Sequence, residues 1–115
     1  MKKTILFLAL IFSINSLIAQ TTKSIINEVN SDTLLLSLEV LSGEKPTDGF
    51  GIIPNRKSEV GKEVTRLYLV QKLESFGLET EIINYRPTGY NVIAIQKGVT
   101  YPDSSFIICG HYDSV

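Results

Sequence analysis

The sequence predicts an α/β protein in which two helices precede three strands of a mixed sheet. Apolar residues recur at helical spacing over residues 24–41 and again over residues 58–76. After Gly77 the period shortens, and two continuous apolar runs follow at residues 91–96 and 105–109. Runs of this kind, bounded by turn residues, are typical of strands buried on both faces of a sheet.

The first helix is expected over residues 24–41, and Gly43 ends its apolar pattern. The pattern consists of apolar residues and one threonine at spacings of three and four: Ile25, Ile26, Val29, Thr33, Leu36, Val40 and Leu41. Residues 43–56 are rich in glycine and proline and are expected to form a loop. We expect this loop to pack on another part of the protein through its apolar side chains: Phe50, Ile52 and Ile53.

The second helix has a recognisable start and end. Ser58 offers a hydroxyl that can cap the free backbone N–H groups of the first turn. Gly77 can adopt the left-handed conformation that often follows a helix. Between them lies an apolar stripe at helical spacing: Val60, Val64, Leu67, Tyr68, Leu73 and Phe76.

Three strands are expected after Gly77. Residues 78–85 alternate partly between apolar and polar, as an edge strand does, and a Pro-Thr-Gly turn at residues 87–89 leads into the strand at 91–96. The third strand covers residues 105–109 and contains the single cysteine, Cys109, which is expected to be a small buried core residue.

Composition excludes several classes of protein. Eleven Lys and Arg residues against twelve Asp and Glu residues give a net charge of −1, which argues against nucleic acid or an anionic membrane as the partner. One cysteine excludes a disulfide framework within the chain, and one histidine excludes a Cys/His cluster for a structural zinc ion.

The first 19 residues have the parts of a secretory signal peptide. Lys2 and Lys3 precede an apolar run at residues 5–14, and Ala19 is a small residue before a polar one. The apolar run is shorter than the roughly 20 residues that a membrane-spanning helix needs. We therefore expect cleavage after Ala19, a mature domain at residues 20–115, no membrane attachment after cleavage, and a secreted or periplasmic location.

Cleavage after Ala19 can be tested by the intact mass of exported protein. The mass should correspond to a chain that begins at Gln20, or to that chain less one ammonia, because an N-terminal glutamine cyclises to pyroglutamate. A chain that begins at Met1, or at a residue far from Gln20, would contradict the signal peptide.

Strands buried on both faces need neighbouring strands and covering helices, and residues 20–115 contain few elements that could supply them. The favoured interpretation is therefore that these residues are the N-terminal part of a larger α/β catalytic domain. A small complete α+β domain is the alternative.

The last six residues carry the candidate chemistry. His111 and Asp113 directly follow an expected core strand, and active sites in open α/β sheets gather beyond the carboxyl ends of strands. A neutral imidazole can bind a metal through one nitrogen while a carboxylate fixes its tautomer through the other. Gly110, immediately before the histidine, allows close backbone approach.

Residues 55–115, and most clearly residues 91–115, resemble the zinc-dependent aminopeptidases related to bacterial leucyl aminopeptidase, a family that also includes glutaminyl cyclases. The resemblance lies in Asn91-Val92-Ile93-Ala94 on one strand, a linker with glycine and Pro-Asp, and Gly110-His111-Tyr112-Asp113-Ser114 after the next strand. It implies the three-layer α/β/α fold of zinc exopeptidases, in truncated form. In the sheet of that family, a later strand lies between the two apolar strands.

The resemblance also implies roles for two residues. His111 would ligate one zinc ion of a two-zinc site, and Asp113 would be the catalytic residue that orients its imidazole. In the family, the other metal ligands and the general base, a Glu-Glu pair among them, come later in the chain. The whole protein would hydrolyse peptides and proteins at their N-termini through a metal-activated water, and residues 20–115 alone would be inactive.

Two other functions stay open from the sequence. A glutaminyl-peptide cyclase of the same fold would share these motifs. A small secreted binding module would have no chemistry, and His111 and Asp113 would then be surface loop residues. The metal ligands expected later in the chain would distinguish these classes.

Overall fold

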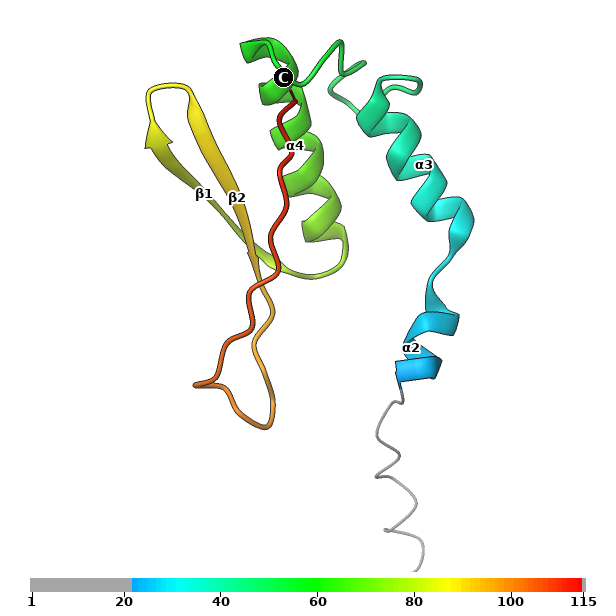
Figure 1. Cartoon of the computed structure of the whole chain (residues 1–115), viewed down its shortest axis with the longest axis vertical. Coiled ribbons are helices and arrows are strands. Elements are labelled where there is room, and N and C mark those ends of the chain that lie inside the picture. Colours follow the sequence, from blue (N-terminus) through cyan, green and yellow to red (C-terminus); the bar gives the residue numbers. More distant parts are fainter. Residues whose placement is uncertain (1–21, 115) are drawn as a thin grey trace, which may run out of the picture. The chain divides into compact units, whose positions relative to one another are not determined.

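The computed structural model describes residues 22–114, a small mixed α/β protein with three helices and a two-stranded antiparallel sheet (Figure 1). The order of elements is α2 (Thr22–Glu28), α3 (Ser31–Ser42), α4 (Glu59–Ser75), β1 (Glu79–Arg86) and β2 (Gly89–Ile95). The signal peptide expected at residues 1–19 lies outside the described residues. None of the helices at residues 22–114 is long and apolar enough to cross a membrane.

The chain divides into two compact units between Leu34 and Leu35, so α3 begins in the first unit and ends in the second. The single helix expected at residues 24–41 is wrong, because α2 ends at Glu28 and α3 begins at Ser31. Asn30 causes the break: its side-chain Oδ1 accepts a hydrogen bond from the backbone N–H of Thr33 at 2.9 Å. This contact caps a new helix and competes with continuation of the first one.

The expected loop after α3 is confirmed. Gly43 ends the helix with a φ of +84°, a left-handed conformation that glycine adopts without strain. The loop then turns back on itself, since the Thr47 hydroxyl donates to the carbonyl of Gly51 at 2.7 Å. Of the apolar loop residues, Ile53 is almost fully buried and Ile52 is exposed. The loop therefore packs on the protein through Ile53.

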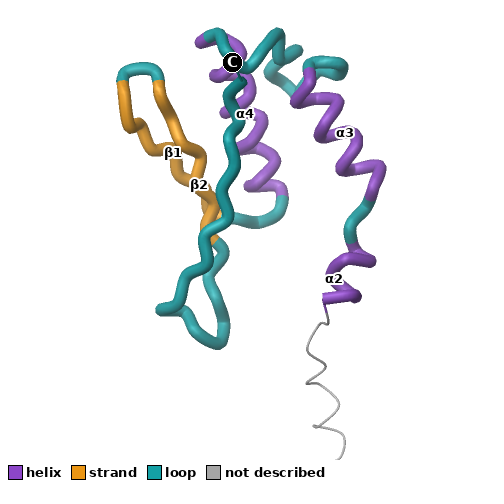
Figure 2. The backbone as a smooth tube through the Cα atoms, viewed as in Figure 1, coloured by secondary structure: helices purple, strands orange, loops and turns teal. Residues whose placement is uncertain are grey.

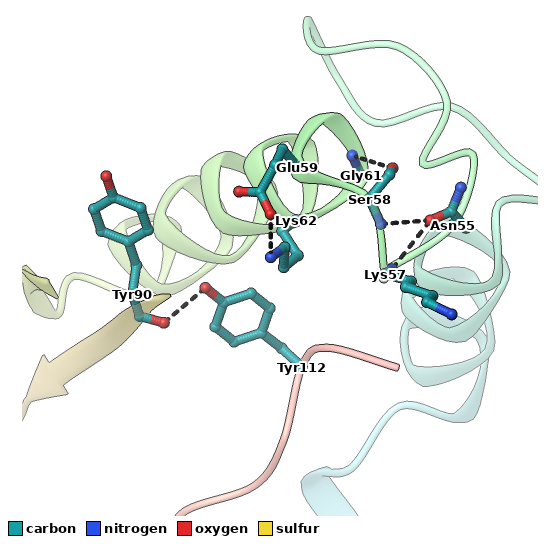
Figure 3. Close-up of polar contacts among 8 residues, drawn as sticks. All are labelled: Asn55, Lys57, Ser58, Glu59, Gly61, Lys62, Tyr90 and Tyr112. Atoms are coloured by element: carbon teal, nitrogen blue, oxygen red, sulfur yellow. Dashed lines mark hydrogen bonds and ion pairs between the residues drawn. The ribbon is translucent and has the colours of Figure 1, made fainter. Parts of the chain in front are cut away.

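Both expected ends of α4 are confirmed. The Ser58 hydroxyl accepts from the backbone N–H of Gly61 at 3.1 Å, and Asn55 Oδ1 accepts from the N–H of Ser58 at 2.8 Å (Figure 3). At the other end, Gly77 has a φ of +76° and its N–H donates to the carbonyl of Glu74. Because these contacts are local, they can be predicted from a few adjacent residues.

Ser58→Ala is expected to destabilise α4 by about 1 kcal/mol, because the N–H of Gly61 loses its acceptor. The helical ellipticity of the mature polypeptide at 222 nm should fall, while Ser58→Asp should preserve it. Ser75→Ala, at the opposite end of α4, is the matched control. Equal ellipticity for Ser58→Ala and Ser58→Asp would contradict the cap.

The core of the second unit is small. Its buried apolar residues among those described are Val40, Ile53 and Tyr68, one each from α3, the loop and α4. Three half-buried side chains pack around them: Leu41, Val64 and Leu69. Other members of the expected α4 stripe, such as Val60 and Phe76, are exposed.

The hairpin of β1 and β2 confirms two expected strands and the turn between them. The strands pair antiparallel from Glu79 opposite Ile95 to Asn84 opposite Tyr90, with an irregularity before the turn (Figure 2). Helix α4 contacts both strands. However, β2 is at most half-buried along most of its length, so the expected burial on both faces is wrong for the described residues.

The third expected strand is also wrong. Residues 105–109 have no regular structure and run as a loop (Figure 2). Phe106, Ile107 and Ile108 are 89–99% exposed, and Cys109 is exposed rather than buried. An extended segment becomes a strand only when a neighbouring backbone pairs with it, and none of the described segments pairs with this one. Within residues 22–114 the sheet therefore has two antiparallel strands and not the three expected strands of a mixed sheet.

Candidate functional site

Two hydrogen bonds tie residues 110–114 to other segments of the second unit. The Tyr112 hydroxyl donates to the carbonyl of Tyr90 in β2 at 2.8 Å (Figure 3). The backbone N–H of Ser114 donates to the carbonyl of Arg56, just before α4, at 3.2 Å. The stretch that contains His111 and Asp113 is therefore held between the hairpin and the start of α4.

The structure brings together the two residues that the sequence singled out. His111 Nδ1 lies 3.3 Å from Asp113 Oδ1. The His111 side chain is 97% exposed and that of Asp113 is 49% exposed. An imidazole whose Nδ1 faces a carboxylate keeps its Nε2 for a metal, and here that nitrogen is accessible from solvent.

In this pair, His111 fits one ligand position of a zinc site, and Asp113 fits the carboxylate that orients such a ligand. Residues 22–114 contain no group of three or more His, Cys, Asp or Glu side chains that could hold a metal ion. A catalytic zinc typically takes three protein ligands and a water. The described part of the chain can therefore supply His111 as a ligand and Asp113 as its orienting group, but no complete site.

Two pockets lie beside the C-terminal stretch, and His111 and Asp113 line one of them. A pocket of about 210 Å³ is lined by the backbone and side chains of residues 110–113 together with residues of α4, β1 and β2, among them Lys62, Arg86 and Asn91. A second pocket of about 400 Å³ lies between α4 and the tip of the hairpin. Four residues line both pockets: Lys62, Thr88, Tyr90 and Tyr112.

The carbonyl that accepts the hydrogen bond from the Tyr112 hydroxyl belongs to Tyr90, whose ring is also held in place. The Arg66 guanidinium stacks over the ring of Tyr90, 4.1 Å from its centroid, and Arg66 also pairs with Glu63 on the same helix. Burial raises the pKa of Tyr112, and the positive charge of Arg66 opposes this shift only in part. The phenol therefore stays protonated, and able to donate, throughout the neutral range.

Tyr112, Tyr90 and Arg66 were not expected from the sequence. The alternation of an extended chain could have indicated Tyr112, because it directs residues 111 and 113 to one side and residue 112 to the other. Nothing in the sequence indicates that Tyr90 is its partner, since the two residues are 22 positions apart.

No protein-family model, no curated protein and no solved structure matches this chain. The resemblance to zinc aminopeptidases therefore rests on the sequence of residues 55–115, chiefly on the motifs at residues 91–94 and 110–114.

Proposed function

We propose that this chain is the N-terminal part of an exported zinc-dependent aminopeptidase. One observation supports the proposal above the others: His111 and Asp113 lie 3.3 Å apart with the imidazole open to solvent, directly after an extended apolar segment. This is the arrangement in which a carboxylate fixes a histidine that binds zinc.

In the proposed site, His111 would bind zinc through Nε2, and its Nδ1–H would donate a hydrogen bond to the Asp113 carboxylate. The carboxylate thereby selects the tautomer that binds metal and makes Nε2 a stronger electron-pair donor to the metal. When bound, zinc supplies a water of lowered pKa and polarises the carbonyl that is attacked. The remaining ligands and the general base would come from residues that follow this chain.

We further propose that the fold is the three-layer α/β/α domain of zinc exopeptidases. Two features of the structure support it: β2 pairs on one side only among the described strands, and the apolar side chains at residues 106–108 are almost fully exposed. A strand from later in the chain that pairs with the free edge of β2 would bury both segments.

The proposal is tested with protein expressed from the complete reading frame. Purified protein should release the N-terminal residue from aminoacyl p-nitroanilides, lose this activity in a metal chelator, and recover it with zinc. Cyclisation of an N-terminal glutaminyl peptide without hydrolysis would indicate a glutaminyl cyclase instead. No turnover of either substrate by zinc-loaded protein would contradict the proposal and favour a binding module.

A further inference from the structure

We infer that Tyr112 is a positioning residue, whose hydroxyl fixes the direction in which His111 and Asp113 face. The inference rests on the proposed function, because it concerns the geometry of the zinc ligand. It assigns a role to the residue between the two motif positions, which the motif itself leaves undefined.

The first support is the alternation of the extended chain. Side chains at positions i and i+2 lie on one side, and the side chain between them lies on the other. Accordingly, the side chains of His111 and Asp113 contact each other. The Tyr112 side chain instead reaches the carbonyl of Tyr90 (Figure 3). A fixed Tyr112 therefore determines which way its two neighbours point.

The second support is the small number of other hydrogen bonds that hold the C-terminal stretch. Between residues 105 and 114, the hydrogen bonds to other described segments are those from the Tyr112 hydroxyl and from the N–H of Ser114. Upstream, nothing lies within 4 Å of the position that a Cβ would take at Gly110, and glycine allows the backbone more conformations than other residues do. Without the Tyr112 hydroxyl, the N–H of Ser114 would make the one remaining hydrogen bond from residues 105–114 to another described segment.

The third support is the rigidity of the acceptor. Tyr90 is held in the β1–β2 ladder opposite Asn84, and its ring lies under the Arg66 guanidinium at 4.1 Å. The carbonyl that accepts from Tyr112 is thus fixed by both the sheet and α4. An anchor attached to a rigid element reduces the number of orientations that the ligand must lose when zinc binds.

The test compares Tyr112→Phe with Tyr101→Phe in protein from the complete reading frame. Tyr101 is a suitable control because the residue is 75% exposed. Removing one hydrogen bond costs about 1 kcal/mol, so the variant should fold. We expect Tyr112→Phe to weaken zinc binding by about 10-fold, as for other groups that orient a ligand, and to alter the visible spectrum of the cobalt-substituted site. Tyr101→Phe should change neither.

The cobalt spectrum distinguishes a positioning role of Tyr112 from a general loss of folding stability. It reports the geometry of the metal ligands in those molecules that are folded and hold cobalt. If wild-type protein binds zinc and cleaves peptides, and Tyr112→Phe matches Tyr101→Phe in zinc affinity and cobalt spectrum, the inference is wrong and the proposed function stands. If wild-type protein neither binds zinc nor cleaves peptides, both are wrong.

Discussion

His111→Ala is expected to abolish peptidase activity in the protein expressed from the complete reading frame. The substitution removes the only imidazole in this chain, and with it the ligand that the proposed site takes from the described residues. Loss of groups that merely orient a ligand typically lowers metal affinity or activity by about 10- to 100-fold, so loss of the ligand itself should exceed that range. Zinc content after dialysis and kcat/KM on a p-nitroanilide substrate measure the two effects.

Asp113→Asn should have a smaller effect on zinc content than His111→Ala but should still lower turnover. An amide can contact Nδ1, but it carries no charge to strengthen the imidazole as a donor. Asp103→Asn, in the exposed loop before the C-terminal stretch, is the matched control. Activity and zinc content near those of wild type in both His111→Ala and Asp113→Asn would remove the metal assignment.

The polypeptide of residues 20–115 is expected to show a broad thermal transition or none. Its described part buries three apolar side chains, at Val40, Ile53 and Tyr68, which is a small core for a chain of this length. Apolar side chains at residues 106–108 face solvent, and β2 has an unpaired edge among the described strands, a combination that favours aggregation. Differential scanning calorimetry of freshly purified polypeptide measures the transition.

Zinc should not move that transition. One histidine and one carboxylate leave most of the coordination to water, and stabilisation by a ligand depends on its affinity for the folded state. A sharp cooperative melt that rises on addition of stoichiometric zinc would show that residues 20–115 are a complete metal-binding domain. That result would contradict the proposal that they are part of a larger one.

The elements that could be predicted from the sequence are those that local contacts define. Ser58 and Gly77 set the ends of α4 through partners within a few residues, and the turn before Gly89 sets the hairpin. The break between α2 and α3 was missed although it is also local. Apolar residues continue at helical spacing across Asn30, and this periodicity predicts one continuous helix. The capping role of the Asn30 side chain does not alter the apolar pattern.

The third strand could not be predicted correctly because its structure depends on a distant partner. Residues 105–109 have the composition of a core strand, but none of the described segments pairs with them. The candidate site likewise has one part that nearby residues define and one part that depends on a distant residue. His111 and Asp113 are two residues apart and were found from their spacing, whereas Tyr112 reaches Tyr90 across 22 positions and was found only in the structure.

The most direct test of the central claim is the nucleotide sequence that follows the codon of Val115. The claim that His111 and Asp113 begin a zinc-exopeptidase site predicts an open reading frame that continues with an aspartate, a Glu-Glu pair, a further carboxylate and a histidine. A stop codon directly after Val115, or a continuation without these residues, would contradict it.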